Sequence, residues 1–189
     1  MTQSKTLRRW ELALLLGVAL AALLGVWLDG AQAALSDRVI RLHVLANSDS
    51  EADQALKLRV RDRILAEAEE LFVPGAGRAE TEELLRAHLY DLAAAGAEVV
   101  GEAGYSYPVT ASLVHDYWFP TKTYTDFALP AGAYTALRIE IGAGGGQNWW
   151  CVVFPPLCLG SVSETTQETA LEAGLTENQV SLMTGEDEG

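Results

Sequence analysis

The chain has 189 residues, of which 49% are hydrophobic, and this suits one domain with its own core. Its 26 acidic and 13 basic residues give a formal net charge of −13, and no basic patch with interleaved aromatic residues offsets that charge. Nucleic acid and anionic lipid headgroups repel such a polyanion, which argues against a nucleic-acid-binding function.

The first 33 residues differ from the rest of the chain. They contain a positive stretch, an apolar run and the small residues of a signal-peptidase site: Lys5, Arg8 and Arg9, then Leu12 to Leu28, then Ala31 and Ala33. The apolar run is longer than a usual signal-peptide core and shorter than a comfortable membrane span. We therefore predict that residues 1–33 are a signal peptide or signal anchor, with cleavage after Ala33 favoured. The chain from Ala34 onward is expected to be exported.

A first strand is predicted from Asp37 to Ala46, where side chains alternate between two faces. Only one of these faces is wholly apolar and expected to be buried: Ile40, Leu42, Val44 and Ala46. His43 lies on the other, mixed face. We predict a surface or hydrogen-bonded histidine there rather than a metal ligand or a catalytic base.

Four residues that compete well for helix caps follow this strand, at positions 47–50. We predict that Asn47, Asp49 and Ser50 form the N-terminal cap of the next helix. An anion-binding site is the alternative interpretation. It is disfavoured because the carboxylates of Asp49, Glu51 and Asp53 would repel the ligand.

Two helices are predicted in succession, from Glu51 to Phe72 and from Ala79 to Ala95. Each has apolar residues at helical spacing, and charged residues flank the apolar stripe of the first. Gly96 is expected to end the second helix. Because a short loop joins them, we expect the two helices to pack as an antiparallel pair.

From Gly104 onward the pattern indicates strands. We predict them from Tyr105 to Val114, from Tyr134 to Ile141 and from Asn148 to Phe154, and the glycine-rich loop 142–146 should join the last two as a hairpin. The aromatic segment 118–124 is expected to be an ordered loop.

The predicted fold class is α+β. It comprises a small, mostly antiparallel sheet with an N-terminal strand, a pair of helices packed on one face, and a C-terminal hairpin. We assign this single domain to residues 34–160. The remaining residues, 161–189, are rich in Ser, Thr, Glu and Gln and are predicted to be an acidic, loosely ordered tail.

The segment from Asn148 to Cys158 contains two of the five tryptophans and both cysteines. Alternation places Trp149, Cys151 and Val153 on one face, and Trp150, Val152 and Phe154 on the other. Both faces are apolar, which is typical of a central strand or of a strand that awaits a partner. Cys151 and Cys158 are candidates for a local disulfide, and two buried thiols are an equal alternative.

No catalytic, cofactor-binding or metal-binding constellation is evident in the sequence. The glycine-rich loop is not GxGxxG and lacks the lysine of a nucleotide-binding loop, and no GxSxG or HExxH occurs. We therefore predict no enzyme activity, no cofactor and no metal. A nucleophilic Cys151, with His43 or His115 as its base, is a weak alternative because a cysteine in an apolar strand has a raised pKa.

Five segments resemble the stage II sporulation protein R family, in the expected order and covering nearly everything from Val39 to Cys158. They are RLHVLANSDS at 41–50, DQALKLRVRD at 53–62, FPTKTY at 119–124, LPAGAYTALR at 129–138 and NWWCVVFPPLC at 148–158. The resemblance implies a signalling role in endospore formation. The protein would be made in the forespore and exported into the space between the forespore and mother-cell membranes.

The resemblance also implies a partner. This is a membrane-embedded aspartic protease of the mother cell, which processes pro-sigma-E once the exported protein has triggered it. Candidate contact residues are aromatic side chains that a one-sided sheet would leave uncovered: Trp118, Tyr124, Trp150 and Phe154. The alternatives are an envelope enzyme acting on peptidoglycan, with Cys151 or His115 at its centre, and a structural module tethered to the membrane by an uncleaved Leu12–Leu28 segment.

Overall fold

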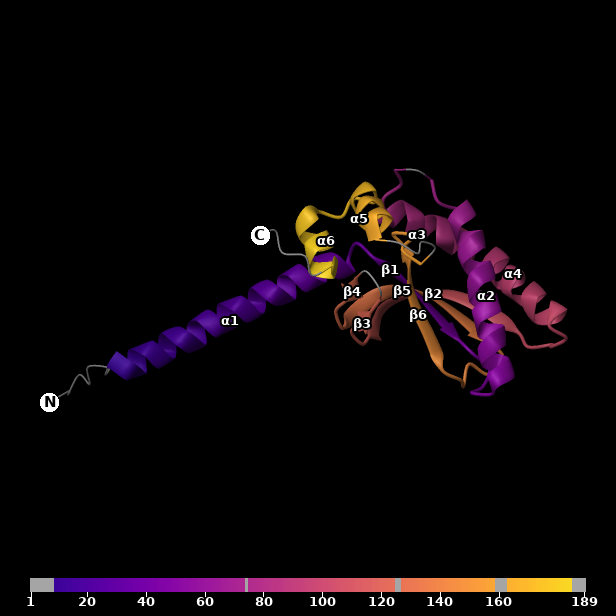
Figure 1. Ribbon diagram of the computed structural model, residues 1–189, viewed down its shortest axis with the longest axis horizontal. Helices are drawn as coiled ribbons and strands as arrows, with labels where there is room; N and C mark the ends of the chain where they lie inside the picture. Colours follow the sequence, from indigo (N-terminus) through magenta and orange to yellow (C-terminus); the bar gives the residue numbers. More distant parts are fainter. Residues whose placement is uncertain (1–8, 74, 125–126, 159–162, 185–189) are drawn as a thin grey trace.

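The computed structural model describes residues 9–73, 75–124, 127–158 and 163–184, except for the side chains of 26–29, 31 and 163–167. A four-stranded sheet in the order β2-β5-β1-β6 forms its centre (Figure 1). These strands are β1 (Ile40–Leu45), β2 (Val109–Phe119), β5 (Gly132–Ile141) and β6 (Asn148–Phe154). β3 (Lys122–Thr123) and β4 (Ala128–Leu129) form a separate two-stranded sheet, and β3 lies within segment 118–124, which was predicted to be a loop. The β1–β5 pair is parallel and the other pairs are antiparallel, which confirms the predicted α+β class.

Strand β1 lies inside the sheet, between β5 and β6. This differs from the predictions that β1 has one buried face and that the last two strands form a hairpin. All six residues of β1 are buried, although only one of its faces was predicted to be. Strands β5 and β6 follow each other in sequence but do not pair, because β1 lies between them; they are not the predicted hairpin. β6 is therefore an edge strand rather than a central one. The strand buried on both faces takes the central position, where both of its backbone edges are paired.

Three helices cover one face of the sheet: α2 (Glu51–Glu70), α3 (Arg78–Ala87) and α4 (Leu89–Glu102). The helix predicted from Ala79 to Ala95 is interrupted at His88, whose backbone N–H donates to the carbonyls of Leu84 and Leu85 and whose Nδ1 lies 2.8 Å from the Leu84 oxygen. The helical pattern resumes at Leu89. Gly96, predicted to end the helix, therefore lies within α4.

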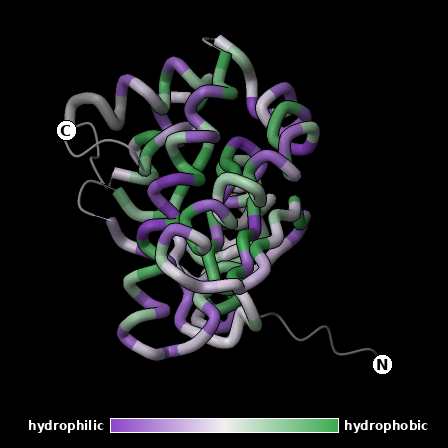
Figure 2. The backbone as a smooth tube through the Cα atoms, turned by 90° about the vertical axis from the view of Figure 1, so that its right-hand side faces the viewer, coloured by the Kyte–Doolittle hydropathy of each residue, from purple (hydrophilic) through white to green (hydrophobic). Residues whose placement is uncertain are grey.

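An aliphatic core fills the space between this face of the sheet and α2–α4. Figure 2 shows hydrophobic residues concentrated in the strands at the centre and hydrophilic ones recurring along the outer helices. The fully buried members of this core come from β1, α2, α3, α4 and β5: Ile40, Leu42, Val44, Val60, Ile64, Ala68, Leu85, Leu92, Leu137 and Ile139. This packing accounts for the strand and helix periodicities of the sequence.

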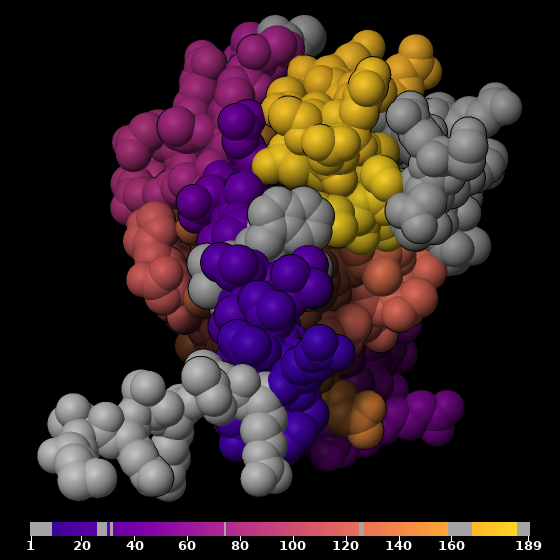
Figure 3. All heavy atoms as spheres, turned by 90° about the vertical axis from the view of Figure 1, so that its left-hand side faces the viewer, coloured from indigo at the N-terminus to yellow at the C-terminus, as the bar shows by residue number. Residues whose placement is uncertain are grey.

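A second core lies on the opposite face and is rich in aromatic residues. Its members include Val39, Phe119, Leu129, Tyr134, Val152 and Met183. The end of α1 (Arg9–Ser36), β3, β4, α5 (Ser163–Glu172) and α6 (Glu177–Thr184) cover it in part, and Figure 3 shows α6 beside α1. The segment expected to be a loosely ordered tail thus contains two helices. Its residues Ala170, Leu175, Val180 and Met183 are buried.

Register shifts in the β2–β5 and β1–β6 pairs reverse the face of the sheet on which the following side chains lie. The β2–β5 register shifts between Val114 and Tyr117, where Asp116 adopts a φ of 53°, so Phe119 faces the second core although alternation from Val109 would direct it to the helices. A shift in the β1–β6 pair has the same effect on Phe154. Phe154 pairs with Ile40 and packs in the aliphatic core, whereas the sequence placed it beside Trp150 and Val152.

Helix α1 projects away from the rest of the molecule (Figure 1). Apolar side chains along it are exposed, among them Leu14, Leu16 and Leu23. Its last turns touch the domain, among others through buried Leu35 and a hydrogen bond from Gln32 Nε2 to the carbonyl of Ala131. Within the described part of the chain, no helix has the apolar length required to cross a membrane. The predicted cleavage site after Ala33 lies inside α1, and the side chain of Ala31 is outside the described residues.

Candidate functional site

The residues predicted to cap a helix form a junction with the glycine-rich loop. Ser50 is the N-cap of α2, and its Oγ accepts a hydrogen bond from the Asp53 backbone N–H. Asn47 Oδ1 instead accepts from the Ala143 N–H at 3.0 Å, and Asp49 Oδ1 accepts from the Gln147 N–H at 2.7 Å. Two of the three predicted cap residues therefore hold the loop between β5 and β6.

Topology explains why this loop is rich in glycine. Because β1 separates β5 from β6, the connection has to cross the end of β1 in close contact with it. The N–H of Gly146 donates to the Ala46 carbonyl at 2.9 Å, and a Cβ on Gly146 would overlap the Ser48 carbonyl. Gly142 adopts a φ of 60°, and a Cβ there would overlap the side chain of Asn47. The loop is thus a connection that passes across the end of β1. It leads into strand β6 rather than into a helix, so it provides no helix N-terminus that could bind phosphate.

The charged groups at this junction are used within the chain. Asp53 Oδ2 accepts hydrogen bonds from Asn47 Nδ2 and Ser48 Oγ, and these bonds lower the pKa of Asp53. Lys57 Nζ donates to Gln54 Oε1 and to the Gln147 carbonyl, and burial lowers the pKa of Lys57. The junction therefore joins β1, α2 and the crossing loop and offers little to an external anion.

Cys151 and Cys158 form a disulfide with Cα atoms 6.0 Å apart. The Cys158 sulfur also accepts the N–H of Val152 at 2.9 Å, so the turn after β6 folds back onto the strand. Together with Arg61 and Trp149 the two cysteines line a cavity of about 340 Å³, in which the Arg61 guanidinium lies 4.3 Å from the Trp149 ring centroid. Cys151 has no thiolate to offer as a nucleophile in this state.

His115 belongs to an ion-pair network that the sequence analysis did not find. Its Nε2 lies 3.3 Å from Glu82 Oε1, and its Nδ1 lies 3.2 Å from Thr135 Oγ1. This hydroxyl–imidazole–carboxylate order resembles a hydrolase triad. However, Thr135 is buried and already accepts a hydrogen bond from Arg78, and Glu82 pairs with Arg78 and Arg86. The network ties α3 to the sheet, and the Arg-Glu-Arg spacing of four residues in the sequence was the signal for it.

The second face contains two buried polar side chains, Arg41 and His43, which the sequence placed on an exposed face. The Arg41 guanidinium lies 4.1 Å from the Phe119 ring centroid and 4.9 Å from that of Tyr134. Such cation–π contacts partly offset the loss of its hydration. Phe119 is central to this cluster because its ring also lies within 6.3 Å of the rings of His43, Tyr117 and Trp150.

Hydrogen bonds tie this aromatic cluster to β6 and to the β3–β4 segment. His43 Nε2 lies 2.8 Å from Asn148 Oδ1, and burial lowers the pKa of His43 while this bond partly offsets the effect. The Tyr124 hydroxyl donates to the Trp150 carbonyl at 3.3 Å. Burial raises the pKa of Tyr124 and of Tyr134, and the charge of Arg41 opposes that rise. Both tyrosines therefore remain neutral hydrogen-bond donors.

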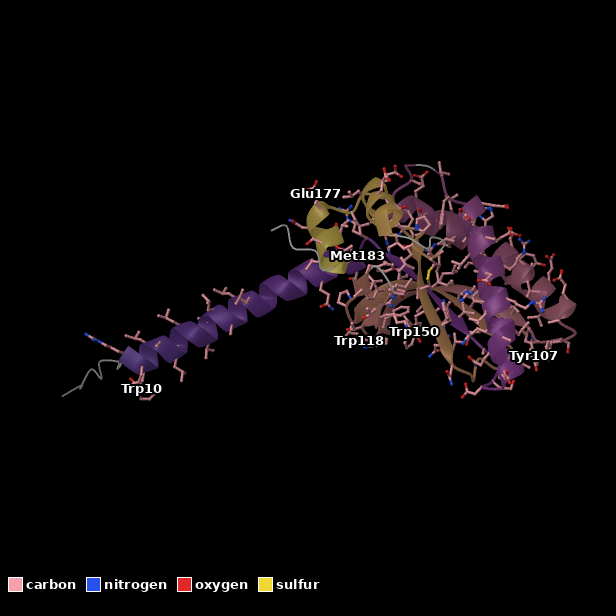
Figure 4. The ribbon with its side chains drawn as sticks, in the orientation of Figure 1. Trp10, Tyr107, Trp118, Trp150, Glu177 and Met183 are labelled. Atoms are coloured by element: carbon pink, nitrogen blue, oxygen red, sulfur yellow. A yellow bond between two sulfur atoms is a disulfide. The ribbon has the colours of Figure 1, made fainter. Side chains whose placement is uncertain are left out.

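The four candidate contact residues do not share one surface. Trp118 is 67% exposed near the end of β2, whereas Tyr124 and Trp150 are partly buried in the second core. Trp118 lies on β2 and Trp150 on β6, which are the two opposite edge strands of the sheet (Figure 4). Phe154 is buried against Phe72 and is not available to a partner in this structure. Among the described residues, no cluster of three histidine, cysteine, aspartate or glutamate side chains could hold a metal.

Comparison with known proteins identifies the chain's relatives. The family model of stage II sporulation protein R matches residues 36–164. Stage II sporulation protein R of Bacillus subtilis (strain 168) is 38% identical over 124 residues, which is 66% of this chain and 55% of that protein. The chain thus spans little more than half the length of this relative. No solved structure matches. The match runs from before β1 to beyond β6 and so includes the whole sheet. This chain therefore belongs to the stage II sporulation protein R family.

Proposed function

We propose that this chain is an exported signalling protein of endospore formation that activates a membrane-embedded aspartic protease of the mother cell. The activated protease then processes pro-sigma-E. Family membership is the observation that carries this proposal. The internal pairing of the Glu82 and Asp53 carboxylates supports a role in binding rather than in catalysis, because neither group is left free to act on a substrate.

Export through residues 1–33 is part of this proposal. The exposed apolar side chains of α1 support it, since Leu14, Leu16 and Leu23 contact no core of the folded domain. The Cys151–Cys158 disulfide also supports an oxidising compartment, such as the space between the forespore and mother-cell membranes. Mass spectrometry of the exported N-terminus tests the site of cleavage. A mature chain beginning at Ala34 is expected, and an intact N-terminus would favour a signal anchor.

We further propose that Trp118 is a contact residue for the protease. An exposed tryptophan on an edge strand is costly in water and is typical of interface anchors. Tyr124 and Trp150 stay separate candidates at the β6 edge, because each is only partly buried and the Tyr124 hydroxyl binds the Trp150 carbonyl.

Co-expression of the full chain with the protease and pro-sigma-E in a non-sporulating bacterium tests this function. The wild-type chain should trigger processing, and Trp118→Ala should reduce it while export continues. Tyr90→Ala is a matched control, because Tyr90 is an aromatic residue that is 83% exposed on α4. Equal processing by wild-type and Trp118→Ala would remove Trp118 from the contact surface. No processing by the wild-type chain would refute the proposed function.

The same assay separates signalling from an envelope enzyme. Cys151→Ser combined with Cys158→Ser, and separately His115→Ala, remove the groups on which the enzymatic alternative depends. We expect both variants to retain processing wherever they remain folded, because a contact signal requires neither group. Loss of processing in a folded, exported His115→Ala protein would favour the enzyme.

A further inference from the structure

The two edges of the sheet differ in how their outward backbone groups are satisfied. At the β6 edge, the Trp150 carbonyl accepts from the Tyr124 hydroxyl, and the Val152 N–H donates to the Cys158 sulfur. These bonds close the edge with groups of the chain itself. β2 forms the opposite edge, and among the strands that the structure describes it pairs only with β5.

Which groups of β2 point outward follows from the hydrogen bond between the Gly142 N–H and the Pro108 carbonyl, at 2.8 Å. In an antiparallel ladder, hydrogen-bonded and non-hydrogen-bonded pairs alternate. In the register that pairs Val109 with Ile141, residues 110, 112 and 114 therefore bond to β5. The backbone N–H and C=O groups of Val109, Ala111 and Leu113 point away from the sheet. None of these groups has a backbone partner among the described residues.

This edge is also accessible. Every residue of β2 from Val109 to Trp118 is partly or fully exposed, in contrast to the six buried residues of β1. The open row ends at the Asp116 bulge, just before exposed Trp118, and Tyr107 lies beyond its other end (Figure 4). A long edge without lysine or an internal proline is a ready template for another strand.

We propose that the outer edge of β2, from Val109 to Leu113, is a docking edge onto which an extended segment of the partner protein adds as a fifth strand. This inference rests on the proposed function and specifies how the partner is recognised. Backbone hydrogen bonds supply the recognition, as in other cases of β-strand addition. The side chains of Val109, Ala111 and Leu113 pack on the aliphatic core, so the added strand is apolar at alternate positions on that side.

The net charge of the chain indicates which kind of strand can pair with this edge. A second copy of this chain would bring another net charge of −13 to the edge, and this opposes pairing between two copies. A neutral or basic extended segment of a different protein meets no such repulsion. The occupant is therefore a strand of the partner rather than β2 of a second molecule.

Proline substitution tests the proposal at a single backbone atom. Ala111→Pro removes an outward N–H and places ring atoms in the path of an added strand, whereas the bonds to β5 at residues 110 and 112 remain. We expect Ala111→Pro to be exported and folded but to lower the rate of pro-sigma-E processing about tenfold or more. Ala111→Ser keeps the N–H and should process like the wild type. Wild-type processing by folded Ala111→Pro overturns the proposal, whereas an inactive wild-type chain overturns the proposed function and this inference together.

Amide hydrogen exchange on the full chain provides a measurement that does not depend on the variant's folding. The amides of Val109, Ala111 and Leu113 should exchange fast and those of 110, 112 and 114 slowly, in strict alternation. Uniformly slow exchange would mean that the edge is already covered, and it would refute the proposal. Slow exchange that appears only at high protein concentration would identify a second copy as the occupant and overturn it equally.

Discussion

The two faces of the central sheet are stabilised in different ways, although they share the same strands. The helix-covered face is a continuous, mostly aliphatic core. The other face buries Arg41 and His43 among the rings of Phe119, Tyr134 and Trp150. Arg41 and Leu42 are neighbours on β1 and are both fully buried, yet they face opposite environments. Burial alone therefore does not reveal which residues stabilise the fold.

The largest effect is expected from Leu42→Ala on the helix-covered face. Removing a fully buried leucine side chain leaves a cavity and should lower the free energy of unfolding by about 2–5 kcal/mol. Arg41→Met is the matched substitution on the other face. It should change stability by about 1 kcal/mol or less, or even increase it, because an apolar side chain replaces a desolvated cation. Denaturant unfolding monitored by circular dichroism measures both, and an equal loss in the two variants would contradict this comparison.

The loop between β5 and β6 crosses the end of β1 and belongs to neither face of the sheet. Substitutions in this loop therefore test backbone geometry rather than the packing of either core. Gly146→Ala should destabilise the protein by about 1–3 kcal/mol, since the new Cβ meets the rigid Ser48 carbonyl. Gly145→Ala is the control, because its Cβ would lie 3.4 Å from the Asn47 carbonyl oxygen, in ordinary contact. Comparable unfolding midpoints for the two variants would show that the loop is free to shift.

A smaller effect, specific to the aromatic face, is expected from pH. Burial holds the folded-state pKa of His43 below its ordinary value of 6.5, so the unfolded chain binds the proton more readily. Stability should therefore decrease as pH falls through about 6.5, and this loss should level off below the folded-state pKa. His43→Gln should flatten the pH dependence in this window. The neighbouring charges of Arg138, Glu140 and Arg41 are unchanged in the variant. An unaltered slope would mean that His43 does not titrate there.

The smallest effect on stability is expected at Trp118. Because 67% of Trp118 is exposed, Trp118→Ala should change the free energy of unfolding by no more than about 0.5 kcal/mol. Thermal unfolding of the full chain measures this. A large loss of stability would place Trp118 in the packing of the second core and would weaken its assignment as a contact residue.

The sequence predicted what depends on local pattern. The start of α2 at Glu51, its Ser50 cap and the α+β class follow from periodicity and capping chemistry. The central position of β1 could not be predicted in this way, because the rings that bury Arg41 and His43 come from distant strands. The faces of Phe119 and Phe154 depend on register shifts that leave no mark in the alternation. The helices in residues 163–184 were missed because their apolar residues are sparse and Gly174 interrupts them.

The central place of β1 also sets the order in which this protein can fold. Its two neighbours, β5 and β6, are the last strands of the sheet to be synthesised, and the pair His43 and Asn148 is separated by 105 positions. This is a topology of high contact order, in which loop-closure entropy is lost before the strand pairs stabilise the sheet. Until β6 emerges, β1 has an unpaired edge and the aromatic cluster has no Trp150. The domain therefore assembles only after nearly the whole chain is available, which is the order that the proposed export as an unfolded polypeptide requires.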